Sequence, residues 1–177
     1  MSLEAFLESC RANGVLVDVL RGALELREVV ERAASEVGAR LIVVDGALAE
    51  AADRGELFLP MEARPLREVD LELLKHHDNG VLLVRSAGAA IAEMGAAVLW
   101  GDARTQRATA MTEHLMVLIR AECVLDVAKA SSVIRGVLTE SGGPVHLVIG
   151  PSATRDVEHV RVLGAHGPVT LRFAVSP

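Results

Sequence analysis

The sequence predicts an α/β fold: a single domain with a central mixed β-sheet flanked by helices and a β-rich C-terminal end. Three observations lead to this prediction. Amphipathic stretches alternate with short Val/Leu/Ile runs in the first half of the chain. Gly- and Pro-rich separators divide apolar runs toward the C-terminus. With 177 residues, 51% of them hydrophobic, the chain is long enough to bury on the order of 70% of the surface that its unfolded form exposes.

The first half of the chain supplies helices and strands in alternation. Residues 23–37 form the clearest amphipathic helix, because Leu26, Val29 and Val30 share one face. The run 40–46 follows as a buried strand, which is the usual order of an α/β unit. The elements expected before residue 80 are a helix at 2–12, a strand at 15–20, a helix at 23–37, a strand at 40–46, a short helix at 47–53, a brief strand at 56–59 and a helix at 65–76.

The second half is expected to be richer in strands. Gly88 and Gly95 weaken a helix over 90–100, so this run is interpreted as a strand that forms a hairpin with the strand at 81–84. Residues 104–122 are predicted to form one long helix, and 124–127 fit either a strand or the continuation of that helix. The remaining predicted strands are 134–138, 145–149, 157–163 and 169–175.

The composition excludes several classes of function. A formal charge of −6 and a pI near 5.5 argue against a nucleic-acid partner, because phosphate contacts require clustered Lys and Arg. Aromatic residues make up 2% of the chain and Tyr is absent, so there is little from which to build stacking platforms for single strands. A small anion in a local pocket remains compatible with this charge.

The chain is expected to be cytoplasmic and not bound to a membrane. Its longest apolar segment, 80–100, is interrupted by Arg85 and Glu93, whereas a spanning helix needs roughly 20 apolar residues. The first ten residues are acidic, opposite to the basic start of a signal peptide. Cys10 and Cys123 are isolated, which favours a reducing compartment.

Chemistry is most expected at residues 73–84, where a helix end turns into a strand with a carboxylate at the corner. Asp78 and Asn79 favour a turn, since their side chains can bond the nearby backbone. Gly80 permits a close backbone approach before the aliphatic strand. The alternative is a plain helix-to-strand connection, because such loops are short and polar in most α/β units.

Other groups are weaker candidates. His76 and His77 point about 100° apart on a helix and cannot easily share one metal ion. Asp45-Gly46 ends a buried strand, where α/β proteins commonly bind ligands, although a lone Asp-Gly turn is also an ordinary connection. Ser141-Gly142-Gly143 fits either an anion-binding nest of backbone amides or a hairpin turn.

Residues 24–143 resemble the diadenylate cyclase domain, the catalytic domain of the DNA-integrity-scanning and related cyclic di-AMP synthases. The resemblance is carried by the order of elements and by short strings. These are a helix that ends in His77-Asp78 before a Gly and an aliphatic strand, a hairpin strand at 91–99, the string Thr105–Ala110 opening a helix, and Thr139–Gly143 ending a late strand. Residues 144–177 are expected to be a β-rich extension of the same single domain, 1–177.

The resemblance implies a nucleotidyltransferase that binds ATP with Mg²⁺ or Mn²⁺ and condenses two ATP into cyclic di-AMP. It also implies a homo-oligomer, because each of two domains brings one ATP to a shared two-fold site. Such phosphoryl transfer depends on positioning and on neutralising charge. Asp78 is implied as the metal ligand and catalytic carboxylate. The implied nucleotide contacts are Gly80, Val81, Arg104, Thr105, Arg107 and Thr109.

Two departures from the family pattern leave alternatives open. Asn79 follows Asp78, so either an extra residue precedes Gly80 or an amide stands where the carboxylate belongs; the literal Asp-Gly-Ala begins at Asp45, one strand too early. Arg107 alone stands in the basic string, with Arg104 about one turn away. The alternative to a divergent cyclase is a catalytically inactive homologue that acts as a nucleotide sensor or a structural subunit. A third hypothesis is an unrelated α/β interaction module.

Overall fold

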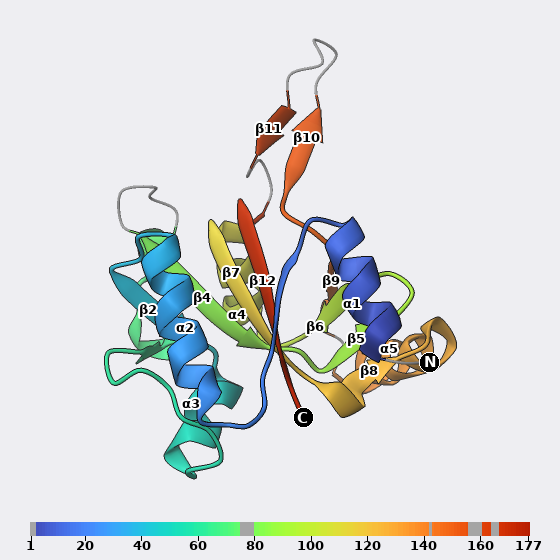
Figure 1. Ribbon diagram of the computed structural model, residues 1–177, viewed down its shortest axis with the longest axis horizontal. Coiled ribbons are helices and arrows are strands. Elements are labelled where there is room, and N and C mark those ends of the chain that lie inside the picture. The colour runs from blue at the N-terminus through green and yellow to red at the C-terminus, as the bar shows by residue number, and fades with distance from the viewer. Residues whose placement is uncertain (1–2, 75–79, 142, 156–160, 164–166) are drawn as a thin grey trace.

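The computed structural model describes residues 3–74, 80–141, 143–155, 161–163 and 167–177. Their main layer is a parallel sheet built from β1 (Leu16–Val19), β2 (Leu41–Val44), β3 (Arg64–Pro65), β4 (Val81–Ser86), β7 (His114–Arg120) and β12 (Thr170–Ser176). The strand order is β1-β12-β7-β4-β2-β3 (Figure 1). The first of these strands along the chain therefore pairs with the last.

Both faces of the parallel sheet are covered. The helices are α1 (Leu3–Ala12), α2 (Glu25–Glu36), α3 (Gly46–Asp53), α4 (Ala103–Met111) and α5 (Val127–Ser141). Val30 and Leu48 of α2 and α3 pack with Leu82 on one face. Phe6 of α1 and Ala108 of α4 share the core of the other face. Burial on two sides explains why the central strands are continuous apolar runs instead of alternating ones.

A second, mixed sheet lies beside the first. It contains β5 (Ala89–Ile91), β6 (Ala96–Leu99), β8 (Val124–Leu125) and β9 (His146–Val148), in the order β8-β5-β6-β9. The β5–β6 and β6–β9 pairs are antiparallel and β5–β8 is parallel. α5 packs on this sheet through Ala130, Val133 and Ile134. A separate antiparallel pair, β10 (Ala153–Arg155) and β11 (Arg161–Leu163), projects from the body (Figure 1).

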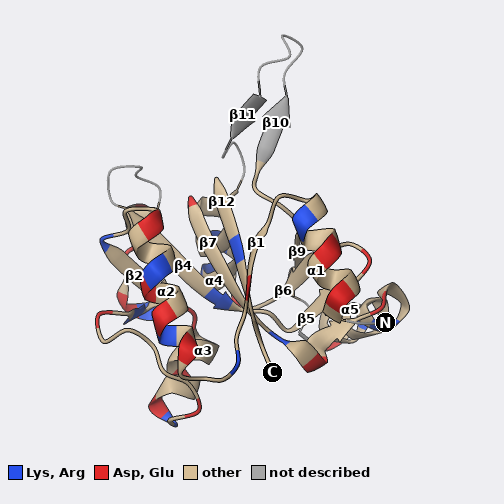
Figure 2. Ribbon diagram, in the orientation of Figure 1, with Lys and Arg blue, Asp and Glu red and all other residues tan. Residues whose placement is uncertain are grey.

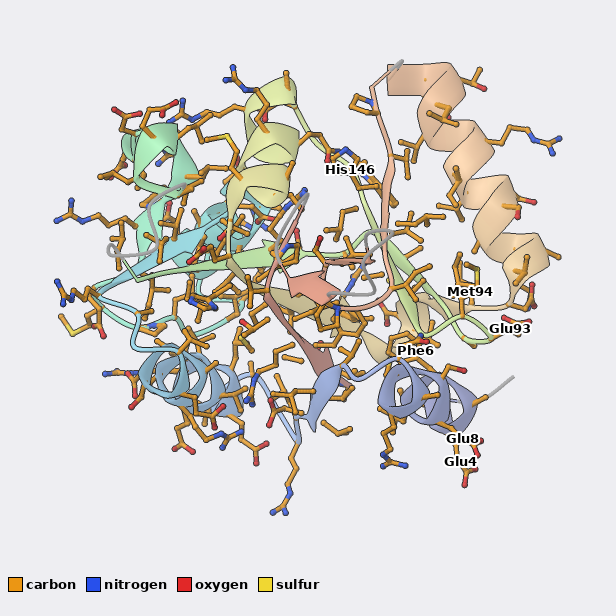
Figure 3. All side chains as sticks on the ribbon, turned by 90° about the horizontal axis from the view of Figure 1, so that it is seen from above. Glu4, Phe6, Glu8, Glu93, Met94 and His146 are labelled. Atoms are coloured by element: carbon orange, nitrogen blue, oxygen red, sulfur yellow. The ribbon has the colours of Figure 1, made fainter. Side chains whose placement is uncertain are left out.

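α1 joins the two sheets. Phe6 points toward the body while Glu4 and Glu8 point away from it (Figure 3). The Phe6 ring stacks on Phe173 of β12, with centroids 6.0 Å apart, and Asn13 Nδ2 donates to the carbonyl of Met94 at 2.8 Å. The helix is thus fixed to the central sheet and to the β5–β6 turn together.

The outer surface carries mixed charge. Figure 2 shows acidic and basic residues interspersed along α2. Asp18 of β1 accepts from Arg32 at 2.5 Å and from Arg172 at 2.7 Å, which links β1, α2 and β12. Among the described residues, no helix is long and apolar enough to cross a membrane.

The predicted α/β class, with helices flanking the sheets and strands at the C-terminal end, is confirmed. The mixed pairing lies in the second sheet. The single strand predicted at 90–100 is in fact two strands, β5 and β6, separated by a turn at 92–95. They form a hairpin with each other, because Gly95 (φ 58°) permits this turn. The run 81–84 pairs with β2 and β7 instead.

Four predicted elements are wrong. The helix at 104–122 ends at Met111, and His114–Arg120 forms the buried strand β7, whose apolar run also fits a helical face. The strand at 134–138 lies inside α5, since Ala130, Val133 and Ile134 have helical spacing toward one core. In the described part of the helix predicted at 65–76, residues 65–74, the chain forms two short 3₁₀ turns instead, Leu66–Glu68 and Leu71–Leu74. The strand predicted at 56–59 is also absent, because these described residues form no strand.

For residues 124–127, the sequence left a strand or a helix open, and the structure has a strand there, β8. The strand predicted at 157–163 begins at Arg161 in the described part of the chain, and 156–160 lie outside it.

Gly80 precedes β4 with φ 52°, and a Cβ there would lie 2.6 Å from the carbonyl oxygen of Gly38. Gly80→Ala should therefore lower the free energy of unfolding by more than about 1 kcal/mol. Gly136 lies in α5 with open space around its Cα, so Gly136→Ala should raise it by about 0.5–1 kcal/mol. Urea unfolding measures both. Equal effects of the two substitutions would contradict the strained turn.

Candidate functional site

The parallel sheet has a switch point between β2 and β4. After β2 the chain enters α3, which packs on one face with Leu48. After β4 it enters the second sheet and α4, which pack on the opposite face. β2 and β4 are neighbours in the sheet, and a cavity lined by Asp45 and Ser86 opens beyond their carboxyl ends. Open α/β sheets bind ligands at such points.

Asp45 directly follows β2 and is 3% exposed. Its Oδ1 accepts from the backbone N–H of Leu48 at 2.9 Å, which caps α3. Its Oδ2 accepts from the backbone N–H of Ser86 at 2.7 Å and from Ser86 Oγ at 2.9 Å. The carboxylate thus joins the end of β2, the start of α3 and the end of β4.

Arg85 is the largest buried charged side chain, with 1% exposure. Its Nη1 donates to Thr109 Oγ1 at 2.6 Å and its Nη2 to the carbonyl of Trp100 at 2.7 Å. Nε lies 3.8 Å from Asp45 Oδ2 and has no hydrogen-bond partner among the described residues. Desolvation lowers the pKa of Arg85, and the charges of Asp45 and Asp102 oppose that shift.

Two adjoining cavities open at this edge of the sheet. We call the cavity that Asp45 and Arg85 line the inner cavity and its neighbour the outer cavity. Their volumes are about 260 Å³ and about 600 Å³, and they share Ala47, Ser86 and Ala87. The outer cavity is lined by apolar side chains such as Leu20, Leu26, Leu48 and Leu118, with Arg54 and Arg120 also on its wall. The inner cavity is lined by Asp45, Arg85, Ser86, Gly88, Trp100 and Thr105.

The wall of the inner cavity depends on a glycine. A Cβ on Gly88 would lie 1.8 Å from the nearest indole atom of Trp100, so the indole ring occupies the space that any other residue would need. Asp102 caps α4 beside this wall, and its Oδ1 accepts from the backbone N–H of Thr105 at 2.7 Å. Hydrogen bonds from the hydroxyl and the backbone N–H of Thr105 lower the pKa of Asp102.

The residues implied by the cyclase resemblance are not brought to one place. Gly80 and Val81 lie at the amino end of β4, whereas Thr105 lines the inner cavity at the carboxyl end. β4 has six residues that rise about 3.3 Å each, so these groups lie at opposite edges of the sheet. Asp78 is outside the described residues.

The remaining predicted contacts have structural partners or face away. Arg104 donates to the backbone carbonyls of Leu66 and Val69. Arg107 is exposed on α4. Thr109 is buried, accepts from Arg85 and donates to the carbonyl of Thr105 at 2.9 Å. Of the predicted contacts, Thr105 alone lines the cleft.

Sequence reasoning treated Arg85 only as an interruption of an apolar segment and did not select Ser86. One feature of the sequence could have identified Arg85: it is a charged residue inside an apolar run that otherwise predicts a strand buried on both faces. In the described part of the chain, no group of three or more His, Cys, Asp and Glu side chains could hold a metal ion. The predicted metal ligand Asp78 lies outside that part.

No protein-family model and no curated protein matches this sequence. The fold is similar to the crystal structure of a DUF162 family protein from Deinococcus radiodurans, with a TM-score of 0.68. The alignment covers 99% of this chain and 96% of the other, at 15% sequence identity. At that identity the similarity establishes the fold alone.

Removing Arg85 should be costly because it leaves a buried carboxylate without its counter-ion. Arg85→Met is expected to lower the free energy of unfolding by about 3–5 kcal/mol. The double variant Asp45→Asn/Arg85→Met should recover part of that loss, since no unpaired charge remains. The control Arg120→Met removes an exposed ion pair with Glu122 and should change stability by at most about 1 kcal/mol. Urea unfolding that gave Arg85→Met and Arg120→Met the same cost would contradict this account.

Proposed function

We propose that this domain binds a small molecule in the cleft formed by the inner and outer cavities. The observation that carries the proposal is the buried Asp45–Arg85 pair, which lies on the wall of the inner cavity at the switch point of the sheet. Its position matches the place where α/β proteins bind ligands. The volume of the outer cavity, about 600 Å³, lies within the usual range of ligand pockets, roughly 300–1,000 Å³.

Stability alone does not account for the pair. Two charges removed from water are often no more stabilising than packed apolar side chains of similar volume. Three observed hydrogen bonds hold the Asp45 carboxylate and two hold Arg85. Such fixed side chains on strand ends supply the rigid, preorganised wall that a binding site needs.

The first ligand class to test is the nucleotide that the sequence resemblance implies. ATP or a related nucleotide would occupy the switch-point cleft instead of the predicted corner at Asp78. Of the two hypotheses that follow from the cyclase resemblance, the geometry favours a non-catalytic nucleotide-binding domain over a diadenylate cyclase. The reason is that Arg104 already bonds backbone carbonyls and that Gly80 and Thr105 lie at opposite edges of the sheet.

Trp100 provides a local reporter, because it lines the inner cavity and is the single Trp of a chain without Tyr. Titration with ATP, with and without Mg²⁺ or Mn²⁺, should change Trp100 fluorescence saturably and raise the melting temperature. At 100 times the Kd, a ligand adds about 2.7 kcal/mol of stability. Ser86→Ala should weaken binding about tenfold, the size of one net hydrogen bond.

The matched control is Ser132→Ala, which removes an exposed hydroxyl from α5 and should leave binding unchanged. Product analysis for cyclic di-AMP in the same samples separates the cyclase hypothesis from the sensor hypothesis: product formation supports the cyclase, and binding without product supports the sensor. If neither ATP nor a wider panel of small metabolites alters Trp100 fluorescence or melting temperature, the proposed function is wrong.

A further inference from the structure

The hydroxyl groups of Ser86 and Thr105, which line the inner cavity, donate their protons to neighbouring carboxylates. Ser86 Oγ lies 2.9 Å from Asp45 Oδ2. An ionised carboxylate can only accept a hydrogen bond, so the hydroxyl proton of Ser86 points at Asp45. The lone pairs of Ser86 Oγ are then the part of this group that remains for a ligand.

Thr105 has the same polarity. Its backbone N–H donates to Asp102 Oδ1 at 2.7 Å, and its side chain also helps to lower the pKa of Asp102. Because a carboxylate can only accept, the Thr105 hydroxyl directs its proton toward Asp102 and leaves its lone pairs for the cavity. Ser86 and Thr105 come from different elements, β4 and α4, and both line the inner cavity.

Arg85 adds no hydrogen-bond donor for a ligand to this cavity wall. Its side chain is 1% exposed, its two terminal nitrogens donate to Thr109 and to the carbonyl of Trp100, and its Nε is buried facing Asp45. The guanidinium therefore acts as an internal counter-ion for Asp45 and presents almost no surface to a ligand.

The helix ends at the cavity are also occupied by acidic caps. Asp45 caps α3 and Asp102 caps α4. Anions bind at helix N-termini because of the exposed N–H groups and the dipole there. A carboxylate already lies at each of these two ends, which disfavours a second negative charge.

From this arrangement we infer that the inner cavity recognises a neutral hydrogen-bond donor, such as a primary amide or an exocyclic amino group, and discriminates against carboxylate and phosphate. The inference rests on the proposed function and specifies the ligand group that enters the inner cavity. A nucleotide would then enter with its base amino group toward Ser86 and Thr105, and its phosphates would remain outside the inner cavity.

Three isosteric probes test donor capacity apart from shape and charge: benzamide, acetophenone and benzoate. Acetophenone is neutral without a donor, and benzoate is an anion without a donor. NMR titration of the full chain should show benzamide binding about tenfold more tightly than either of the others, the effect of one net hydrogen bond. Adenosine against purine riboside, which lacks only the amino group, repeats the comparison on a nucleoside.

Variants locate the effect. Ser86→Ala and Thr105→Val should each reduce the preference for benzamide over acetophenone to about threefold or less, each removing one of two acceptors. Thr139→Val is the matched control for Thr105→Val, because Thr139 is an exposed helical Thr that bonds its own helix backbone, and it should leave the preference unchanged.

Each outcome decides between the two proposals. If benzoate or acetophenone binds the cleft as tightly as benzamide, and purine riboside as tightly as adenosine, the donor preference is wrong while the binding function stands. If none of these probes shifts the resonances of Trp100 or Ser86, and ATP also fails to bind, the proposed function falls as well. Binding of ATP with no response to the amide and amino probes overturns the donor preference alone.

Discussion

The architecture of the site depends on one carboxylate. Asp45 accepts hydrogen bonds from Leu48 and Ser86 and lies 3.8 Å from the Nε of Arg85. It therefore fixes the separation of the ends of β2 and β4, starts α3 and balances the buried guanidinium. An Asn in its place could not do all three, because its amide would bring a donor where three acceptor sites and a negative charge are needed.

Local pattern was sufficient for the elements whose neighbours along the chain are also their neighbours in space. The helix predicted at 23–37 and the strand at 40–46 correspond to α2 and β2, since each carries an unambiguous period or run. Pattern failed at His114–Arg120 and at 134–138. His114–Arg120 is a strand buried on both faces, and its continuous apolar run cannot be told from a buried helix by pattern. Residues 134–138 contain β-branched side chains, which favour strands, but they form a helix because it packs on the second sheet.

The site was harder to predict than the fold. The sequence identified Asp45 as the end of a strand, but its hydrogen-bond partner Ser86 lies 41 positions later. Between β2 and β4 in the sequence comes β3, yet β3 lies at the edge of the sheet and does not separate them in space. The motif order suggested instead that Gly80 and Thr105 share a site, although β4 separates them by its full length. Helix direction explains this: α4 runs back along the sheet, so its start lies near the end of β4, not near its beginning.

The position of β12 has a consequence for biosynthesis. β12 is the last strand along the chain, yet it lies inside the sheet between β1 and β7, and β1 has no other strand partner among the described residues. While the ribosome is still adding residues before 170, β1 and β7 both present unpaired edges, and pairing by non-local strands is slow to form. Completion of the main sheet therefore has to follow emergence of residues 170–176, and until then β1 and β7 present open edges of the kind that promote association with other chains.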